Sequence, residues 1–202
     1  MLVEHRGKRP QVDRTAYVAP NAVLCGDVRV GPSCRILFGA VLTAEGGPVT
    51  LDEGCIVMEN AVIRGTKKHE VRIGKHCLVG PRAYLSGCHI EDDVFVSTGS
   101  TVFNGARIGT GAELRVNSVV HVDSIVLAGT TVPIGWVAVG HPAEVLPPGE
   151  HAHIWALQEP LDFPRVVFGL KRAPTRAMMP LLVKRYTRAL GTHRDDVVVE
   201  EE

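Results

Sequence analysis

The chain has 202 residues, and its 22 Lys and Arg balance 22 Asp and Glu, so the formal net charge is zero at pH 7. This balance gives no reason to expect nucleic acid as a partner, and no run of residues reaches the roughly 18 apolar positions of a membrane span. The opening MLVEHRGKRP is polar, so we expect a soluble, cytoplasmic protein. Five cysteines without a CxxC pair argue against a disulfide framework or a structural zinc module.

Residues 1–16 show no clear pattern, and we predict that they lead into the fold. A repeat of six residues then occupies 17–149, with one five-residue step from Leu85 to Ile90. A period of six fits neither an amphipathic helix, near about 3.6, nor the alternating strands of a β-sandwich, near about 2. It is typical of a parallel β-helix of triangular section. The best-preserved inward positions are Ile73, Val79, Leu85, Ile90, Val96, Val102, Ile108, Leu114, Val120, Val126 and Val132.

We therefore predict an all-β solenoid, a left-handed parallel β-helix of hexapeptide repeats over 17–149, followed by a C-terminal α-helical segment over 150–202. Two insertions interrupt the repeat in adjacent coils, Ala44 to Pro48 (AEGGP) and Arg64 to Arg72 (RGTKKHEVR). Insertions in a solenoid form loops, often on the binding face. We expect small, buried side chains to stack one above another inside the prism; these are Cys34, Cys55 and Cys77.

Three parts of the sequence carry a resemblance to a known family. They are VRIGKHCLVGPRAYLSGCHIEDDVFV (71–96), the ending VGHPAEVL (139–146) and the helical region that follows. Over roughly residues 17–190 the chain resembles the γ-class carbonic anhydrases, which belong to a hexapeptide-repeat superfamily that also contains many acyltransferases. The resemblance implies a homotrimer in which three histidines bind a metal between neighbouring subunits.

The positions that match those three histidines hold other residues, Arg64, Pro81 and Ser86. Proline has no side-chain donor, arginine stays protonated and repels a cation, and serine is a poor zinc ligand. Without zinc no bound water acquires a pKa near 7, so the hydration chemistry has no nucleophile. We therefore expect no metal at these positions, no cofactor and no hydration of CO2.

The same resemblance places two acidic residues, Glu45 and Glu59, near this site. We expect Arg64 and Ser86 to lie at a cleft between subunits, with one of these carboxylates paired to Arg64. The cleft is then either an interfacial salt bridge or a pocket in which Arg64 binds an anion or carboxylate in bidentate fashion. This interpretation favours a role in binding or assembly, or an activity on an unidentified small ligand.

Two alternatives remain open. Ile73 to His89 (IGKHCLVGPRAYLSGCH) is similar to a segment of galactoside and maltose acetyltransferases, in which a histidine acts as general base and acetyl-CoA lies between subunits. Here the segment is about one residue short, and Ile90 restarts the repeat without an acceptor-binding loop. The second alternative is a metalloenzyme with relocated ligands, for which the candidates are the nine histidines, His5, His69, His76, His89, His121, His141, His151, His153 and His193.

The C-terminal segment differs in composition from the repeat. We expect Ile154, Trp155 and Leu157 to pack on the prism, and a helix from Pro180 to Leu190 with an apolar stripe of Leu182, Tyr186 and Ala189. Residues 163–194 contain eight Lys or Arg and no Asp or Glu, and an acidic tail follows. The helix is expected to lie along a prism. The alternative is that this basic amphipathic segment binds an acidic partner or a membrane surface.

Overall fold

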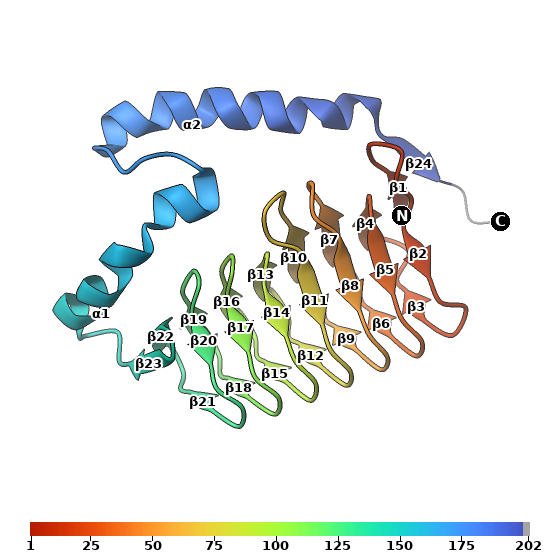
Figure 1. Ribbon diagram of the computed structural model, residues 1–202. Helices are drawn as coiled ribbons and strands as arrows, with labels where there is room; N and C mark the ends of the chain where they lie inside the picture. The colour runs from red at the N-terminus through yellow and green to blue at the C-terminus, as the bar shows by residue number, and fades with distance from the viewer. Residues whose placement is uncertain (200–202) are drawn as a thin grey trace.

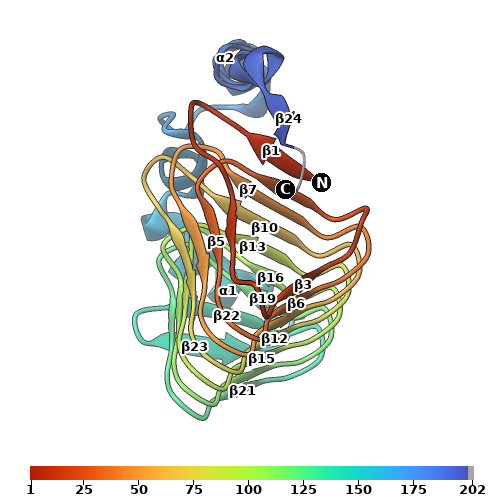
Figure 2. The same ribbon diagram turned by 90° about the vertical axis from the view of Figure 1, so that its right-hand side faces the viewer.

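The computed structural model describes residues 1–199, so Glu200–Glu202 of the predicted acidic tail lie outside the described residues. The chain forms a triangular prism whose faces are three β-sheets, and it visits the three faces in turn (Figures 1 and 2). Within the coils, strands on each face pair in parallel with the strand one coil earlier and one coil later. This confirms the predicted left-handed parallel β-helix with a C-terminal helical segment.

The first sheet has ten strands and the other two have seven each. The first contains β1 Leu2–Glu4, β4 Val23–Cys25, β7 Val41–Ala44, β10 Val62–Gly65, β13 Tyr84–Ser86, β16 Thr101–Val102, β19 Val119–Val120, β22 Val137–Gly140, β23 Ala143–Leu146 and β24 Val197–Val199. The second contains β2 Gln11–Val12, β5 Val28–Val30, β8 Val49–Leu51, β11 Val71–Ile73, β14 His89–Ile90, β17 Arg107–Ile108 and β20 Ile125–Val126. The third contains β3 Tyr17–Val18, β6 Arg35–Ile36, β9 Ile56–Val57, β12 Leu78–Val79, β15 Phe95–Val96, β18 Glu113–Leu114 and β21 Thr131–Val132.

The core is a set of aliphatic columns inside the prism. All the inward positions predicted between Ile73 and Val132 are buried, with exposed fractions of 0 to 3%. Neighbouring strands lie about 4.8 Å apart, so each side chain packs directly on its counterpart in the next coil. The cysteines follow the same rule, and their thiols donate to carbonyl oxygens of the next coil over 3.0, 2.9 and 3.0 Å. These donors are Cys34, Cys55 and Cys77, which bond to Asp52, Gly74 and Glu91.

The solenoid begins earlier than the sequence predicted. Residues 1–16, expected to be a lead-in, contain β1 and β2. Leu2 of β1 pairs with Leu24 of β4, and Val12 of β2 pairs with Val30 of β5. These strands have three and two residues, and the turn between them interrupts the six-residue period, so the repeat was not visible in this part of the sequence. The first coil is therefore part of the fold.

The C-terminal segment closes one end of the prism and then returns to the other. After the antiparallel pair of β22 and β23 come α1 (His151–Gln158), η1 (Glu159–Leu161), η2 (Pro164–Phe168), α2 (Thr175–Leu190) and η3 (Gly191–Asp195). Helix α2 runs back along the prism, and β24 pairs antiparallel with β1 (Figure 1). None of the helices described for residues 1–199 has the length and hydropathy needed to cross a bilayer.

Three details of this segment differ from expectation. Helix α2 begins at Thr175, directly after Pro174, and Pro180 lies inside it at the loss of one backbone hydrogen bond. Ile154 is buried against the prism, but Trp155 is exposed, and the Arg172 guanidinium lies 5.1 Å from its ring centroid.

Aromatic rings connect the segment to the prism. The ring of Phe163 lies 5.2 Å from that of Phe103 and 5.7 Å from that of His121, measured between centroids. Phe168 continues the series at 5.8 Å, and Tyr186 of α2 lies 6.1 Å beyond it. Of the predicted helix stripe, Leu182 and Tyr186 are half-buried while Ala189 is exposed. Helix α2 is thus attached through one edge rather than buried along a face.

Candidate functional site

The corner that the sequence singled out lies where strands of the first sheet end and the chain turns toward the second sheet. Arg64 on β10 pairs in register with Thr43 of β7 and Ser86 of β13, so the predicted neighbours Arg64 and Ser86 do come together. Ser86 is only 3% exposed. Its hydroxyl donates to Oδ1 of Asn104 over 3.2 Å, and Nδ2 of Asn104 donates to the hydroxyl of Thr66 over 3.2 Å. The Ser86 hydroxyl is therefore part of a buried hydrogen-bond chain.

Glu45 is the carboxylate that reaches Arg64. Its Oε1 lies 3.8 Å from Nη2 of Arg64 and accepts a hydrogen bond from the Thr43 hydroxyl over 3.2 Å. Glu59 and Pro81, the other residues predicted near this site, lie in turns that lead from the third sheet into the first. Within one chain they therefore occupy a different corner of the prism from Arg64.

The C-terminal segment also reaches this corner, which the sequence did not predict. Nε2 of His193 in η3 lies 3.2 Å from both carboxylate oxygens of Glu45. Nδ1 of the same ring lies 2.7 Å from Oδ2 of Asp196, and Oδ1 of Asp196 lies 2.6 Å from Nδ1 of His5. A continuous polar network thus runs from Arg64 through Glu45 to the two ends of the chain.

This network shifts the ionisation of its members. The pKa of His193 lies above its ordinary value because of the hydrogen bond to Asp196; burial opposes the shift and Glu45 reinforces it. Burial acts to raise the pKa of Asp196, but its hydrogen bonds to His193 and His5 outweigh burial and hold the pKa below its usual range. The protonated form of His193 and the deprotonated form of Asp196 are therefore both favoured.

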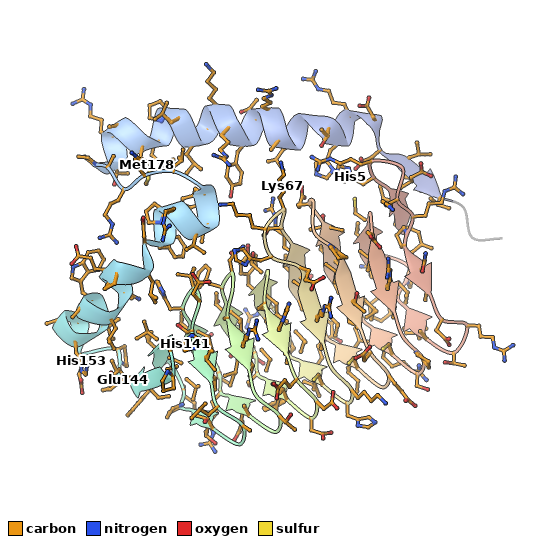
Figure 3. All side chains as sticks on the ribbon, viewed as in Figure 1. His5, Lys67, His141, Glu144, His153 and Met178 are labelled. Atoms are coloured by element: carbon orange, nitrogen blue, oxygen red, sulfur yellow. The ribbon has the colours of Figure 1, made fainter. Side chains whose placement is uncertain are left out.

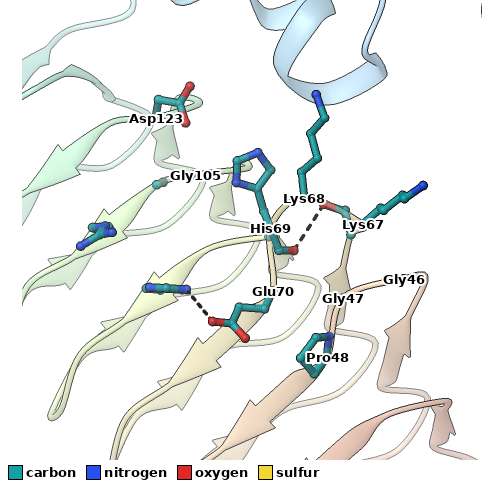
Figure 4. A pocket seen from close by; sticks show the side chains of 14 residues that line it. Gly46, Gly47, Pro48, Lys67, Lys68, His69, Glu70, Gly105 and Asp123 are labelled. Carbon is teal, nitrogen blue, oxygen red and sulfur yellow. Dashed lines mark hydrogen bonds and ion pairs between the residues drawn. The ribbon is translucent and has the colours of Figure 1, made fainter. Parts of the chain in front are cut away.

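A pocket of about 520 Å³ opens beside this corner, between the two inserted loops. Figure 4 shows Lys67, Lys68, His69 and Glu70 projecting from the second loop, with Asp123 across from them. The loops meet closely, because a Cβ added to Gly47 would lie 2.2 Å from the carbonyl oxygen of Thr66. The insertions predicted in adjacent coils therefore form loops that lie together, and they form the wall of a pocket whose rim is largely basic.

His89, the candidate general base, lines this pocket from β14. Its Nε2 lies 3.6 Å from Oε1 of Glu70, too far for a hydrogen bond, while Glu70 pairs with Nε of Arg72 over 2.7 Å. Burial lowers the pKa of His89, and the nearby cations Arg107 and Arg72 act in the same direction against Glu70. The imidazole is therefore neutral near pH 7 and able to accept a proton.

The remaining histidines mostly occur singly. Nδ1 of His76 lies 3.3 Å from Oδ1 of Asp93, and His153 contacts Glu144 and Glu150 at the far end of the prism. His121 is buried, and its Nδ1 has no hydrogen-bond partner among the described residues. Only His5 and His193 stack on one another, with ring centroids 4.4 Å apart. No periodic signal could have indicated this pair, because neither residue belongs to the repeat.

Several basic residues of the segment 163–194 are engaged locally. Nε of Arg165 lies 3.2 Å from Asp162, Nη1 of Arg172 lies 3.1 Å from Glu159, and Arg185 donates to the carbonyl oxygen of Gly169 over 3.2 Å. The side chains of α2 are largely exposed to solvent, and none of its residues is buried. The binding of an acidic partner or a membrane surface stays a prediction.

Comparison with known proteins agrees with this fold. No family model matches the chain. It is 31% identical over 145 residues to gamma carbonic anhydrase 1, mitochondrial, of Arabidopsis thaliana, covering 69% of this chain and 50% of the relative. It is 34% identical over 103 residues to the carnitine operon protein CaiE of Escherichia coli, covering 51% and 53%. The chain thus spans about half the length of these curated relatives.

A solved structure extends the likeness to nearly the whole chain. The hexapeptide transferase family protein of Anaplasma phagocytophilum superposes with a TM-score of 0.53 at 24% identity, over 96% of this chain and 97% of that one. An identity this low shows the fold alone. Fold and repeat together define a hexapeptide-repeat left-handed β-helix protein. Within that class its sequence is similar to those of the gamma carbonic anhydrases.

Proposed function

We propose that this γ-carbonic-anhydrase-like protein does not hydrate CO2 and acts as a homotrimeric binding or assembly protein. The observation that carries the proposal is the contact of Arg64 with Glu45 at the corner where the resemblance implies a metal. A guanidinium in that place repels a cation, and the neighbouring Ser86 hydroxyl is buried in its own hydrogen bonds. These residues do not fit a zinc ion, so this corner supplies no zinc-bound water for hydration.

Two features support assembly. Arg64 and Pro81 lie on different corners of one prism, so a site of the family's kind requires a neighbouring subunit to bring a second corner to the first. Helix α2 also exposes large apolar side chains, with Met179, Leu181 and Val183 between 42% and 60% exposed. Apolar surface of this kind favours contact with another chain, and closed symmetric oligomers are the usual outcome.

Light scattering and CO2 hydration by stopped flow test this proposal. We expect a mass of three chains, and no rate above buffer after incubation with Zn²⁺. A monomer, or hydration that zinc stimulates and a chelator removes, contradicts it.

A gain-of-ligand variant tests the location of the corner. The triple substitution R64H/P81H/S86H should bind one more Zn²⁺ per chain than His193→Ala alone, whereas R64H/S86H, which lacks the second corner, should bind it at least about tenfold more weakly. Both variants are built on His193→Ala, so that zinc elsewhere in the chain does not enter the comparison. Equal affinity of the two variants contradicts the placement of Pro81 beside Arg64 across a subunit boundary.

The loop pocket favours acyl transfer as a second candidate function. Lys67 and Lys68 at its rim suit the phosphate groups of a ligand such as acetyl-CoA, and the neutral His89 can accept the proton of an acceptor hydroxyl or amine. Calorimetry with CoA should show binding that K67A/K68A weakens at least about tenfold, with salt dependence. His89→Ala should retain CoA binding and lose acetyl transfer, and the exposed His76→Ala should behave as the parent. No heat at millimolar CoA excludes this function.

A further inference from the structure

The two ends of the chain meet in a cluster of four side chains that the proposed function does not use. His5 follows β1, Cys25 ends β4, His193 lies in η3 and Asp196 precedes β24. Each offers one ligand atom, and these atoms all lie within 4.8 Å of one another. Figure 3 shows His5 beneath the C-terminal end of α2, next to the first coil. In the described part of the chain this is the one group of His, Cys, Asp or Glu with such spacing.

The donor set suits zinc. Zn²⁺ takes imidazole nitrogen, thiolate sulfur and carboxylate oxygen at about 2.0–2.3 Å, and four such ligands in a tetrahedron lie about 3.3–3.8 Å apart. Sγ of Cys25 lies 3.8 Å from Oδ2 of Asp196, within that range. The Asp196 oxygens lie 2.6 and 2.7 Å from Nδ1 of His5 and His193, so these pairs need to separate by about 1 Å or less. Two neutral imidazoles, one thiolate and one carboxylate neutralise the dication.

The surroundings are those of a metal site rather than of surface charges. His5 is 2% exposed and Cys25 is 6% exposed. Nε2 of His5 is buried and has no hydrogen-bond partner among residues 1–199, so Nδ1, the atom that meets Asp196, is the one by which this ring is held in the cluster. Glu45 accepts from Nε2 of His193, which leaves Nδ1 of that ring to face the cluster. A carboxylate that orients a ligating imidazole in this way is the usual second layer of a zinc site.

We infer that His5, Cys25, His193 and Asp196 form a zinc site that fastens the C-terminal segment to the first coil. It shares no ligand with the corner of Arg64, Pro81 and Ser86. Four protein ligands leave no open position, so the ion serves to hold structure. On binding, the Nδ1 proton of His193 and the proton of the Cys25 thiol pass to solvent, and the Nδ1 proton of His5 moves to Nε2 of the same ring, so that both imidazoles are neutral. The lone pairs that these protons leave then bind the ion. The consequence is a closed chain, in which the C-terminal end of α2 is fastened to the first coil.

Metal titration of the full chain tests this inference. Protein stripped with a chelator is titrated with Co²⁺ and then with Zn²⁺. We expect one equivalent of Co²⁺ per chain, with the visible bands of tetrahedral cobalt and a thiolate-to-cobalt charge-transfer band, and their displacement by Zn²⁺. Absence of binding at micromolar metal, or a spectrum without the charge-transfer band, overturns the site.

Variants locate the metal. His193→Ala removes a ligand on the surface turn, and Asp196→Asn keeps the side-chain shape; each should weaken Co²⁺ at least about 100-fold. Cys25→Ser should lose the charge-transfer band, and His153→Ala, an exposed histidine elsewhere, should change nothing. Circular dichroism establishes that each variant is folded. A band that survives Cys25→Ser assigns the thiolate to another cysteine and overturns the assignment, as does unchanged affinity in both His193→Ala and Asp196→Asn.

A second readout tests the fastening itself. Trypsin cleaves after the Lys and Arg of α2, and zinc should slow this cleavage at least about tenfold in the parent chain and leave it unchanged in His193→Ala. Equal protection by zinc in the parent and the variant shows that the ion does not hold the segment.

Discussion

Nε2 of His193 lies 3.2 Å from both carboxylate oxygens of Glu45, although 148 residues separate them in the chain. Glu45 also contacts Arg64, 3.8 Å away. One carboxylate therefore joins the corner predicted from the repeat to the returning C-terminal segment. Because Glu45 is only 15% exposed, its charge is poorly solvated by water and depends on these two partners.

This relationship predicts a measurable coupling. In urea unfolding with a chelator present, the double-mutant cycle of Glu45→Gln and His193→Gln should give an interaction free energy of about 0.5–1.5 kcal/mol. The matched control is the exposed pair of Glu144 and His153, whose atoms lie 3.1 Å apart. Both of its side chains are about half exposed, so its coupling should be near zero. Equal coupling in the two cycles means that the Glu45–His193 contact is no more than a surface pair.

The close approach of the two loops predicts the effect of a single methyl group. In Gly47→Ala the new Cβ meets the carbonyl oxygen of Thr66, which belongs to the backbone and cannot rotate away. The loops must separate, so we expect a loss of about 1–3 kcal/mol in the free energy of unfolding, together with weaker binding of any ligand of the pocket.

The control for this substitution is Gly149→Ala. A Cβ at Gly149 meets nothing within 4 Å, so its free energy of unfolding should stay within about 0.5 kcal/mol of the parent. If Gly47→Ala is as stable as Gly149→Ala, the two loops do not pack as the structure describes.

Much of the prism could be predicted because its contacts are periodic. Each coil repeats the same inward positions, so counting six residues at a time places Arg64 beside Ser86 and stacks Cys34, Cys55 and Cys77. The same count shows that two insertions from adjacent coils must meet. In these respects the local sequence determines the contact, because neighbouring coils are also neighbours in register.

The rest depends on contacts that no period describes. His5 and Asp196 lie 191 residues apart and meet because the C-terminal segment returns along the prism and adds β24 beside β1. Composition indicated a helix in this segment but gave neither its path nor its anchors. The sequence predicts that Ile154, Trp155 and Leu157 all pack on the prism, yet only the direction of α1 decides which of them do, and Trp155 is exposed. Glu59 lies in a turn at another corner of the same prism, so its predicted place beside Glu45 depends on a neighbouring subunit.

The aromatic series predicts how the segment is held at the other end. Phe163 stacks edge-on against both Phe103 and Phe168, and each such pair contributes about 0.5–1.5 kcal/mol. In Phe163→Ala we expect α2 to open roughly tenfold more often, seen as faster tryptic cleavage there, while the prism unfolds at nearly the parent temperature. The control is Trp155→Ala, which removes a ring that is larger than that of Phe163 but exposed. Similar cleavage in both variants means that the Phe163 contacts do not hold the segment.

His121 gives a prediction for the dependence of stability on pH. Burial lowers its pKa, against a backbone hydrogen bond and the nearby Asp123 carboxylate, which act to raise it. The unfolded chain protonates this imidazole near about pH 6.5, whereas the folded chain does so only at lower pH. At this residue the unfolded state thus binds more protons in this window, and the contribution of His121 to the free energy of unfolding falls as pH decreases through about 6.5.

Urea unfolding between about pH 7.5 and about pH 5.5 measures the slope. His121→Gln should flatten it, and His89→Gln should add to the effect because burial lowers the pKa of His89 too. His76→Gln, at an exposed turn position, is the matched control for the substitution itself. His193, whose pKa is raised, contributes in the opposite direction, so the comparison of parent and variant decides the question. If His121→Gln keeps the full slope of the parent, the imidazole is not held neutral between the rings of Phe103 and Phe163.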